Sequence, residues 1–188
     1  CLIALDDIKL VGRHNVANAM VALAVAMQVG IPVKHAVETL RQFQGLPHRC
    51  QWVRSLRGVD YYNDSKGTNV NATCQAIDGV AQKTSGSVYL IAGGLAKEAD
   101  FGPLVPLLRN HVAGIVLIGR DGQMIADAVG DAVQTQFADS LEEAVQICRE
   151  RAVSGDAVLL SPACASQDMF KDFAHRGRVF VATVEGLQ

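Results

Sequence analysis

The sequence has few aromatic residues, no long apolar run and almost no net charge. Aromatic side chains make up 5% of the 188 residues, whereas apolar residues make up 49%, so Val, Ile, Leu and Ala must dominate any core. The longest strictly apolar run, residues 19–27, is far shorter than the roughly 20 residues of a membrane-spanning helix. A net charge of −2 gives no general attraction to nucleic acid or to anionic membranes. We therefore expect neither nucleic-acid partners nor membrane insertion.

Cysteine is also scarce and widely spaced. The five cysteines contain no C-x-x-C pair, which argues against a disulfide framework and against a zinc site. This usage fits a reducing compartment, and we expect a cytoplasmic location. No secretory signal is visible. Because the chain begins at Cys1, we interpret it as part of a longer protein.

The apolar pattern predicts two helices at the start of the chain, residues 15–29 and 33–43. The first has few polar interruptions, so we expect it to be largely buried. Residues 45–47 (GLP) then break the pattern, which indicates a domain boundary. We therefore divide the chain into residues 1–45 and residues 46–188.

From residue 50 onward, short strands and helices alternate. Nearly all-apolar strands are typical of a sheet that is covered on both faces. The alternation predicts a doubly wound, mostly parallel α/β domain that begins with a β-hairpin. The expected strands are residues 50–56, 59–63, 87–92, 114–118, 133–137 and 157–160, and the expected helices are residues 69–79, 102–110, 123–129, 141–153 and 168–184.

Ligands of such sheets bind beyond the carboxyl ends of the strands, and the loop that follows residue 63 is rich in functional groups. Residues 63–69 (NDSKGTN) bring a carboxylate, an ammonium group and hydroxyls to a strand-to-helix turn. The free N–H groups of a helix start suit an anion. The alternative is that Asp64 and Thr68 are only turn and N-cap residues.

Three further loops follow expected strands. Residues 93–97 (GGLAK) allow a ligand to approach the backbone and add a cation, although a glycine pair also suits a plain flexible loop. Residues 161–166 (SPACAS) are small and include two hydroxyls. We interpret Cys164 as a buried packing residue, because no His partner lies nearby in sequence. Residues 119–122 (GRDG) could contact phosphate through Arg120, but a surface turn with an ion pair is the preferred interpretation.

Two polar motifs lie further upstream. Residues 46–49 (LPHR) place a His-Arg pair at the predicted boundary, where Arg49 could fork onto phosphate or belong to a solvated linker. Residues 12–15 (GRHN), together with Asn18, stand at the start of the first helix. Their simplest interpretation is capping of that helix.

Taken together, these motifs resemble the signatures of the Mur ligase family. The order and spacing of residues 12–15, 46–49 and 63–69 agree with that family, and the resemblance extends over nearly the whole chain. The loops at residues 93–97 and 161–166 are similar to those of the family member that adds D-glutamate. One departure is Gln167, which stands where that member is expected to have Leu.

The resemblance implies a cytoplasmic, monomeric, three-domain ligase of peptidoglycan synthesis, and hence of cell-wall formation, cell shape and division. It would use ATP and Mg²⁺ to join D-glutamate to UDP-N-acetylmuramoyl-L-alanine through an acyl phosphate. Residues 1–45 would be the tail of the central ATPase domain, and residues 46–188 its Rossmann-like C-terminal domain, which binds D-glutamate. The sequence contains no G-x-x-x-x-G-K-[ST] phosphate loop. We therefore expect this chain alone to be inactive, with the metal ligands mainly outside it.

The same resemblance implies roles for individual residues. Lys66 would be catalytic, because a cation near the acyl phosphate stabilises developing negative charge. The D-glutamate carboxylates would be held by Thr68, Lys97, Ser166 and the backbone near Phe173. The nucleotide would be bound by Asn15, Asn18, His48, Arg49 and Asp64.

Two alternatives remain at the level of the sequence. A folylpolyglutamate synthase also adds glutamate through an acyl phosphate, but residues 93–97 and 161–166 argue against it. A nucleotide-binding module without chemistry would carry G-x-G-x-x-G after its first parallel strand, and the sequence contains no such motif.

Overall fold

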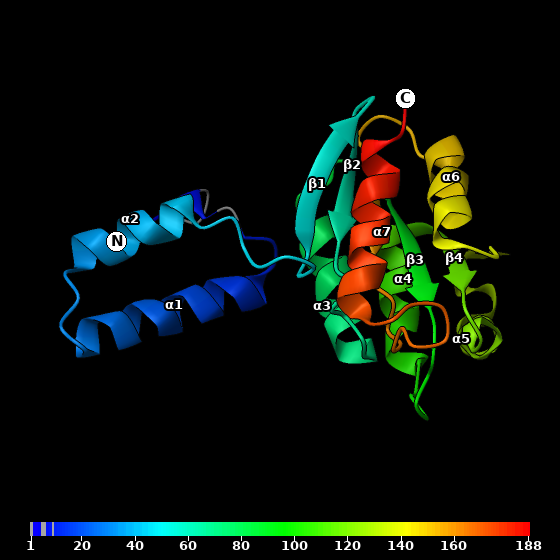
Figure 1. Cartoon of the computed structure of the whole chain (residues 1–188), viewed down its shortest axis with the longest axis horizontal. Helices are drawn as coiled ribbons and strands as arrows, with labels where there is room; N and C mark the ends of the chain where they lie inside the picture. Colours follow the sequence, from blue (N-terminus) through cyan, green and yellow to red (C-terminus); the bar gives the residue numbers. More distant parts are fainter. Residues whose placement is uncertain (1, 5–6, 9) are drawn as a thin grey trace.

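The computed structural model describes residues 2–4, 7–8 and 10–188, and for Arg13 and His14 only the backbone. Its centre is a six-stranded sheet with the order β1-β2-β6-β3-β4-β5 (Figure 1). β1 runs antiparallel to β2, and the other neighbouring pairs are parallel. The strands are β1 (Gln51–Leu56), β2 (Val59–Asn63), β3 (Val88–Gly93), β4 (Val112–Ile118), β5 (Gln134–Phe137) and β6 (Ala157–Leu160).

Helices cover both faces of this sheet. The helices α3, α4 and α5 pack on one face, whereas α6 and α7 pack on the other (Figure 1). Two further helices, α1 and α2, form an arm that projects from the sheet domain. The bounds are α1 (Arg13–Gln28), α2 (Val33–Gln42), α3 (Val70–Ala81), α4 (Val105–His111), α5 (Gly122–Val129), α6 (Leu141–Arg151) and α7 (Phe173–Glu185), with short 3₁₀ turns η2 (Gly102–Leu104) and η3 (Gly130–Ala132).

The core has two layers because alternate residues of each strand point to opposite faces. In β3, Leu90 packs in the layer under α3 and α4, whereas the next residue, Ile91, packs in the layer under α6 and α7. In β6, Leu159 likewise packs in the layer under α3 and α4, and Leu160 packs in the layer under α6 and α7. Full burial of each such side chain contributes about 1.5–3 kcal/mol. This two-sided burial explains why the central strands β3, β4 and β6 are almost entirely apolar.

The predicted fold class is confirmed, and the expected strands and helices lie where the pattern placed them, with one correction. The last helix was expected to begin at residue 168 but begins at Phe173. The chain first makes a turn, in which the amides of Met169 and Phe170 both donate to the Ser166 carbonyl. Asp172 then caps the helix by accepting from the amide of His175. The apolar spacing of residues 169 and 170 imitated a first helical turn.

The prediction that the first helix is largely buried was wrong. Of its described side chains, those of Ala19 and Leu23 are buried, whereas Met20, Val21 and Val25 are 57–66% exposed. The reason is that α1 contacts chiefly α2, and the two helices stand apart from the sheet (Figure 1). Among the described residues, no helix combines the length and apolar character that crossing a membrane would require.

Two segments join the arm to the sheet domain. One is the linker around Gly45, and the other is the stretch before α1, where Val11 is buried in the core beneath α3. A Cβ atom on Gly79 of α3 would lie 2.9 Å from the Cα of Gly12, so only glycine lets the two backbones approach this closely. The Lys83 ammonium also donates to the Leu10 carbonyl at 3.2 Å. The boundary between residues 45 and 46 stays a prediction.

Candidate ligand site

The loops singled out in the sequence meet at one edge of the sheet. β2, β6 and β3 are neighbouring parallel strands, so their carboxyl ends lie side by side. Backbone hydrogen bonds then join the loops: Ala163 N–H donates to the Gly67 carbonyl at 2.9 Å, and Leu95 and Ala165 exchange two bonds of 2.9 and 3.0 Å. The backbone thus joins residues 63–69, 93–97 and 161–166, the loops that follow three neighbouring strands.

Arg176 of α7 connects these loops through hydrogen bonds from its buried side chain. This residue was not identified from the sequence. Its side chain is 1% exposed. The guanidinium donates to the hydroxyl and carbonyl of Ser65, both at 3.0 Å, to the Cys164 carbonyl at 3.2 Å and to the Gly93 carbonyl at 3.5 Å. Burial lowers the pKa of Arg176 to about 10. A signal was available, because Arg176 shares one helix face, at spacings of four, with the core residues Phe180 and Val184.

Asn63 and Ser65 connect the first loop to the start of α7. Asn63 is fully buried, and its side-chain oxygen accepts from the Ser65 amide at 3.1 Å. Its amide nitrogen donates to the Gly177 carbonyl at 3.2 Å and lies 3.0 Å from His48 Nδ1. The Ser65 hydroxyl donates to the Phe173 carbonyl at 2.7 Å. Each polar group of this pair is therefore used to fix the loop.

His48 lies against α7 and is not among the residues that line the large cavity described below. Its ring meets Phe173 edge-on, with centroids 6.2 Å apart, and a Cβ on Gly177 would overlap it. Burial, followed by the positive charge of Arg178, lowers the pKa of His48, while Asp172 opposes this. A neutral ring also fits the hydrogen bond, because Nδ1 can then accept from the Asn63 amide.

Asp64 is a buried carboxylate at the end of β2. Its Oδ1 accepts from the Cys50 amide at 3.0 Å, and its Oδ2 accepts from the Ser161 hydroxyl at 2.7 Å. The side chain of Ser161 also reaches Thr73 at 3.0 Å. Burial raises the pKa of Asp64 to about 6, and the hydrogen bonds from Ser161 and Cys50 offset only part of this effect. Asp64 is therefore more than a turn residue, and the N-cap of α3 is Asn69.

The raised pKa of Asp64 predicts a pH-dependent stability. The carboxyl titrates near 4 in an unfolded chain and near 6 in the folded protein. The folded state binds the proton more tightly, so this stabilisation is complete below pH 4 and is lost as pH rises through 6. Between pH 4 and pH 7, the wild-type protein should lose about 2–3 kcal/mol of unfolding free energy relative to Asp64→Asn.

Urea unfolding of both proteins across this pH range measures that difference. Asp127→Asn is a matched control, because Asp127 is exposed on α5. The unfolding free energy of this variant relative to wild type should stay the same across the pH range. A wild-type protein that gains stability relative to Asp64→Asn as pH rises would show that the Asp64 pKa is lowered by folding.

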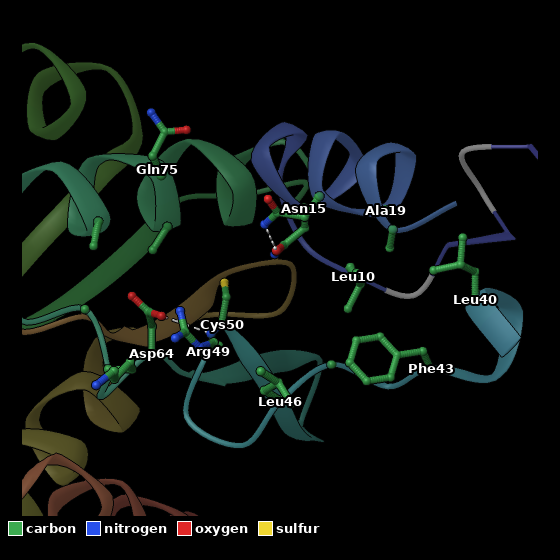
Figure 2. Close-up of a pocket in the computed structure, with 17 residues that line it drawn as sticks. Leu10, Asn15, Ala19, Leu40, Phe43, Leu46, Arg49, Cys50, Asp64 and Gln75 are labelled. Carbon is green, nitrogen blue, oxygen red and sulfur yellow. Dashed lines mark hydrogen bonds between the residues drawn. The ribbon is translucent and has the colours of Figure 1, made fainter. Parts of the chain in front are cut away.

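A cavity of about 480 Å³ lies between the arm and this edge of the sheet. Figure 2 shows Asn15 of α1 on one side and Arg49, Cys50 and Asp64 on the other, with Phe43 and Leu46 adding apolar surface. Five residues assigned from the sequence line it, namely Asn15, Asn18, Arg49, Asp64 and Lys66. The Asn15 amide donates to the Val11 carbonyl at 2.7 Å. The cavity thus combines apolar walls, amides and two cations.

Lys66 stands where the cavity meets the start of α7. Its ammonium lies 4.0 Å from the centroid of the Phe173 ring, a cation–π contact, and its backbone amide donates to the His48 carbonyl at 3.0 Å. The side chain lines the cavity and belongs to the loop that Arg176 holds through Ser65. Lys66 can therefore place a positive charge between the cavity and the joined loops.

Of the four remaining predicted residues, three lie on the joined loops and the fourth, Phe173, lies at the start of α7. Thr68 is half-buried, Lys97 is exposed and Ser166 is 2% exposed. Within the described part of the chain, none of these three side chains has a hydrogen-bond or ion-pair partner. Phe173 is the first residue of α7, and N–H groups at a helix start point outward and suit an anion. Together they offer a cation, hydroxyls and a backbone amide to a ligand.

Two subsidiary interpretations are confirmed. Cys164 is 1% exposed, and burial raises the pKa of its thiol to about 12, which fits a packing residue and not a nucleophile. Arg120 pairs with Asp121 at 3.0 Å on the surface. Over the described ranges, no group of three or more His, Cys, Asp or Glu residues lies close enough to hold a metal ion.

The family model named "Mur ligase, glutamate ligase domain" matches residues 48–164. The chain belongs to the Mur ligase family. It is 51% identical to the UDP-N-acetylmuramoylalanine–D-glutamate ligase of Marinobacter nauticus and 46% identical to that of Coxiella burnetii. Each match covers 99% of this chain but 42% of the relative, so the chain spans less than half the length of these curated relatives.

Solved structures show the same fold. The UDP-N-acetylmuramate–alanine ligase of Thermotoga maritima has a TM-score of 0.71 at 17% identity, over 95% of this chain and 39% of that one. A bifunctional folylpolyglutamate synthase/dihydrofolate synthase of Yersinia pestis, complexed with AMPPNP and Mn, has a TM-score of 0.63 at 20% identity, over 85% of this chain and 37% of that one. At these identities the likeness concerns the fold alone.

Proposed function

We propose that this chain is the C-terminal part of an ATP-dependent ligase that adds D-glutamate to UDP-N-acetylmuramoyl-L-alanine in peptidoglycan precursor synthesis. The observation that carries the proposal is the joined set of loops with Thr68, Lys97 and Ser166, which lies with Phe173 of α7 beside a cavity lined by Arg49 and Lys66. Relatives that are named for this activity share 46–51% of the sequence. Solved structures of folylpolyglutamate synthases, the alternative, are 20–21% identical.

In this proposal the cavity holds the nucleotide. Its apolar walls and the amides of Asn15 and Asn18 suit the adenine ring, and Arg49 can fork onto the phosphates. Asp64 would accept hydrogen bonds from the ribose hydroxyls. Both of its oxygens already accept internal bonds, but a carboxylate has about four lone-pair sites. His48 lies outside the cavity, against α7, and would support nucleotide binding by fixing the loop that carries Arg49.

The chemistry has two steps. The γ-phosphoryl group of ATP is transferred to the carboxylate of the L-alanyl group, which gives ADP and an acyl phosphate. The amine of D-glutamate then attacks the acyl carbon, so that a C–N bond forms, the C–O bond to phosphate breaks, and phosphate and a proton leave. Lys66 would stabilise the negative charge that develops on the phosphate oxygens. The two carboxylates of D-glutamate need donors, while its amine must stay free to attack.

Mg²⁺ would neutralise the nucleotide phosphates when bound. The described residues of this chain do not provide a carboxylate cluster for it, so they do not fit a complete metal site. The exposed apolar face of α1, with Met20, Val21 and Val25, supports a central domain that continues beyond residues 1–45. We propose that the phosphate loop and the metal ligands belong to that domain, and that the ligase is a cytoplasmic monomer.

Substrate-dependent phosphate release by the intact ligase tests the proposal. Release should require ATP, UDP-N-acetylmuramoyl-L-alanine and D-glutamate together, and it should stay at background with a folate and L-glutamate. Release with the folate pair alone would replace the proposal by the folylpolyglutamate synthase alternative.

The 188-residue chain by itself should bind nucleotide without turning it over. Phosphoryl transfer needs a phosphate cradle and a bound metal, and the sequence has no phosphate loop. A thermal-shift comparison should show stabilisation by ATP and ADP but not by NAD, and a coupled assay should detect no ADP production above a buffer control. Steady ATP turnover that survives repeated purification would contradict the proposed division of the chain.

A further inference from the structure

The surface turn between β4 and α5 contacts two of the loops that carry the proposed amino-acid ligands, those of Lys97 and Ser166. Gly119 at the end of β4 has a φ of 75° and packs against Gly94 on one side and Asp168 on the other. A Cβ atom on Gly119 would lie 2.9 Å from the Gly94 Cα and would overlap the Asp168 carboxylate. The turn therefore contacts the Lys97 loop and the Ser166 loop, which also pair directly with each other through Leu95 and Ala165.

Asp121 makes the connection to the Lys97 loop. Its Oδ2 accepts from the Ala96 amide at 2.9 Å, and its own amide donates to the Gly94 carbonyl at 3.0 Å. The carboxylate is also paired with the exposed Arg120. Ala96 directly precedes Lys97. The Asp121 carboxylate therefore fixes the backbone one residue before the lysine that is proposed to bind D-glutamate.

The other side of the same turn is tied to the Ser166 loop. The Arg120 amide donates to Asp168 Oδ2 at 2.9 Å. Asp168 lies two residues after Ser166, in the turn in which the Ser166 carbonyl accepts the amides of Met169 and Phe170. Two carboxylates therefore connect one short turn to two loops.

The Lys97 loop needs this support because of its backbone conformation. Lys97 and Glu98 have φ values of 45° and 56°, in the left-handed region that is unfavourable for residues other than glycine. Two consecutive residues keep this conformation only when neighbouring groups fix the chain. The Ala99 amide closes the turn that contains this pair by donating to the Ala96 carbonyl at 3.0 Å, and the Ala96 amide ties the start of the turn to Asp121.

We propose that Asp121 is a positioning residue for amino-acid recognition, which holds Lys97 at a set distance from Ser166 through the Ala96 amide. This inference rests on the proposed function. It assigns Asp121 no contact with the substrate. Asp121 affects the binding of D-glutamate and not the use of ATP. The reason is that its contacts lie on the Lys97 loop and Arg120, away from the nucleotide cavity.

The test is steady-state kinetics of the intact ligase with Asp121→Ala and Asp121→Asn. Asparagine keeps an oxygen that can accept from the Ala96 amide, so Asp121→Asn should stay within about threefold of wild type. Asp121→Ala should raise KM for D-glutamate about tenfold, as expected for one lost hydrogen bond to a charged group. The KM values for ATP and for UDP-N-acetylmuramoyl-L-alanine should not change. Asp127→Ala, on the exposed side of α5, is the matched control and should leave all three values unaltered.

The outcomes separate the two claims. If wild-type enzyme uses D-glutamate and Asp121→Ala leaves its KM unchanged, the positioning role is overturned while the proposed function stands. A rise shared by all three KM values would also overturn it, because it indicates general destabilisation. Equal effects of Asp121→Ala and Asp121→Asn would overturn it as well, because they indicate a pure charge effect. Wild-type enzyme that makes no use of D-glutamate would overturn the proposed function and this inference together.

Discussion

Lys97→Ala in the intact ligase should raise KM for D-glutamate by about 30- to 1000-fold, the effect of losing a charge-assisted hydrogen bond worth about 2–4 kcal/mol in a site. Lys97 is exposed, and its side chain is unpaired within the described part of the chain, so it is available for a carboxylate. It lies on the loop that exchanges backbone hydrogen bonds with the Ser166 loop. KM values for ATP and the UDP substrate should change little.

The acyl phosphate should still form in Lys97→Ala, because that step precedes the attack by the amine. Trapping it chemically in the variant, beside wild type, checks this. Lys34→Ala is a suitable control, since Lys34 is an exposed lysine of α2, and α2 belongs to the arm that projects away from the sheet domain (Figure 1). Unchanged D-glutamate kinetics in Lys97→Ala would remove Lys97 from the site and leave its loop an ordinary surface turn.

Arg176→Met should destabilise the folded chain by about 3–5 kcal/mol. The substitution keeps a long side chain but removes the donors to Ser65, Gly93 and Cys164, and each buried acceptor left unpaired costs about 1–3 kcal/mol. Urea unfolding at pH 7 measures the change. Arg176→Lys should lie between wild type and Arg176→Met, because an ammonium group replaces only some of the bonds.

The neighbouring Arg178 provides the control for this prediction. Arg178 is exposed on the same helix, so Arg178→Met should change the unfolding free energy by no more than about 0.5 kcal/mol. An Arg176→Met protein within about 1 kcal/mol of wild type would mean that the loops hold their positions without the buried guanidinium.

The sheet domain could be predicted from local patterns because each pattern had a single physical cause. Two-sided burial made β3, β4 and β6 almost entirely apolar. The joining of residues 63–69, 93–97 and 161–166 followed from the rule that parallel strands present their carboxyl ends at one edge. The roles of Thr68, Lys97, Ser166 and Phe173 came from family resemblance, and they remain predictions.

Other features depend on contacts that no local pattern contains. The exposure of α1 could not be read from its composition, because an apolar helix has the same sequence whether or not a neighbour covers it. The bonds of Arg176 reach residues more than 80 positions away as well as nearby Cys164. The turn at Gly119 looked like a plain surface turn, since its ion pair is local while its contacts to Ala96 and Asp168 are not.

The most direct test of the account is the position of the glutamyl carboxylates in a crystal structure of the intact ligase with its product bound. The account predicts them beside the Lys97 ammonium, the Thr68 and Ser166 hydroxyls and the backbone amide of Phe173, with ADP in the cavity lined by Asn15 and Arg49. Carboxylates that lie inside that cavity, or that are more than about 4 Å from all four of these groups, a separation beyond hydrogen-bond reach, would contradict it.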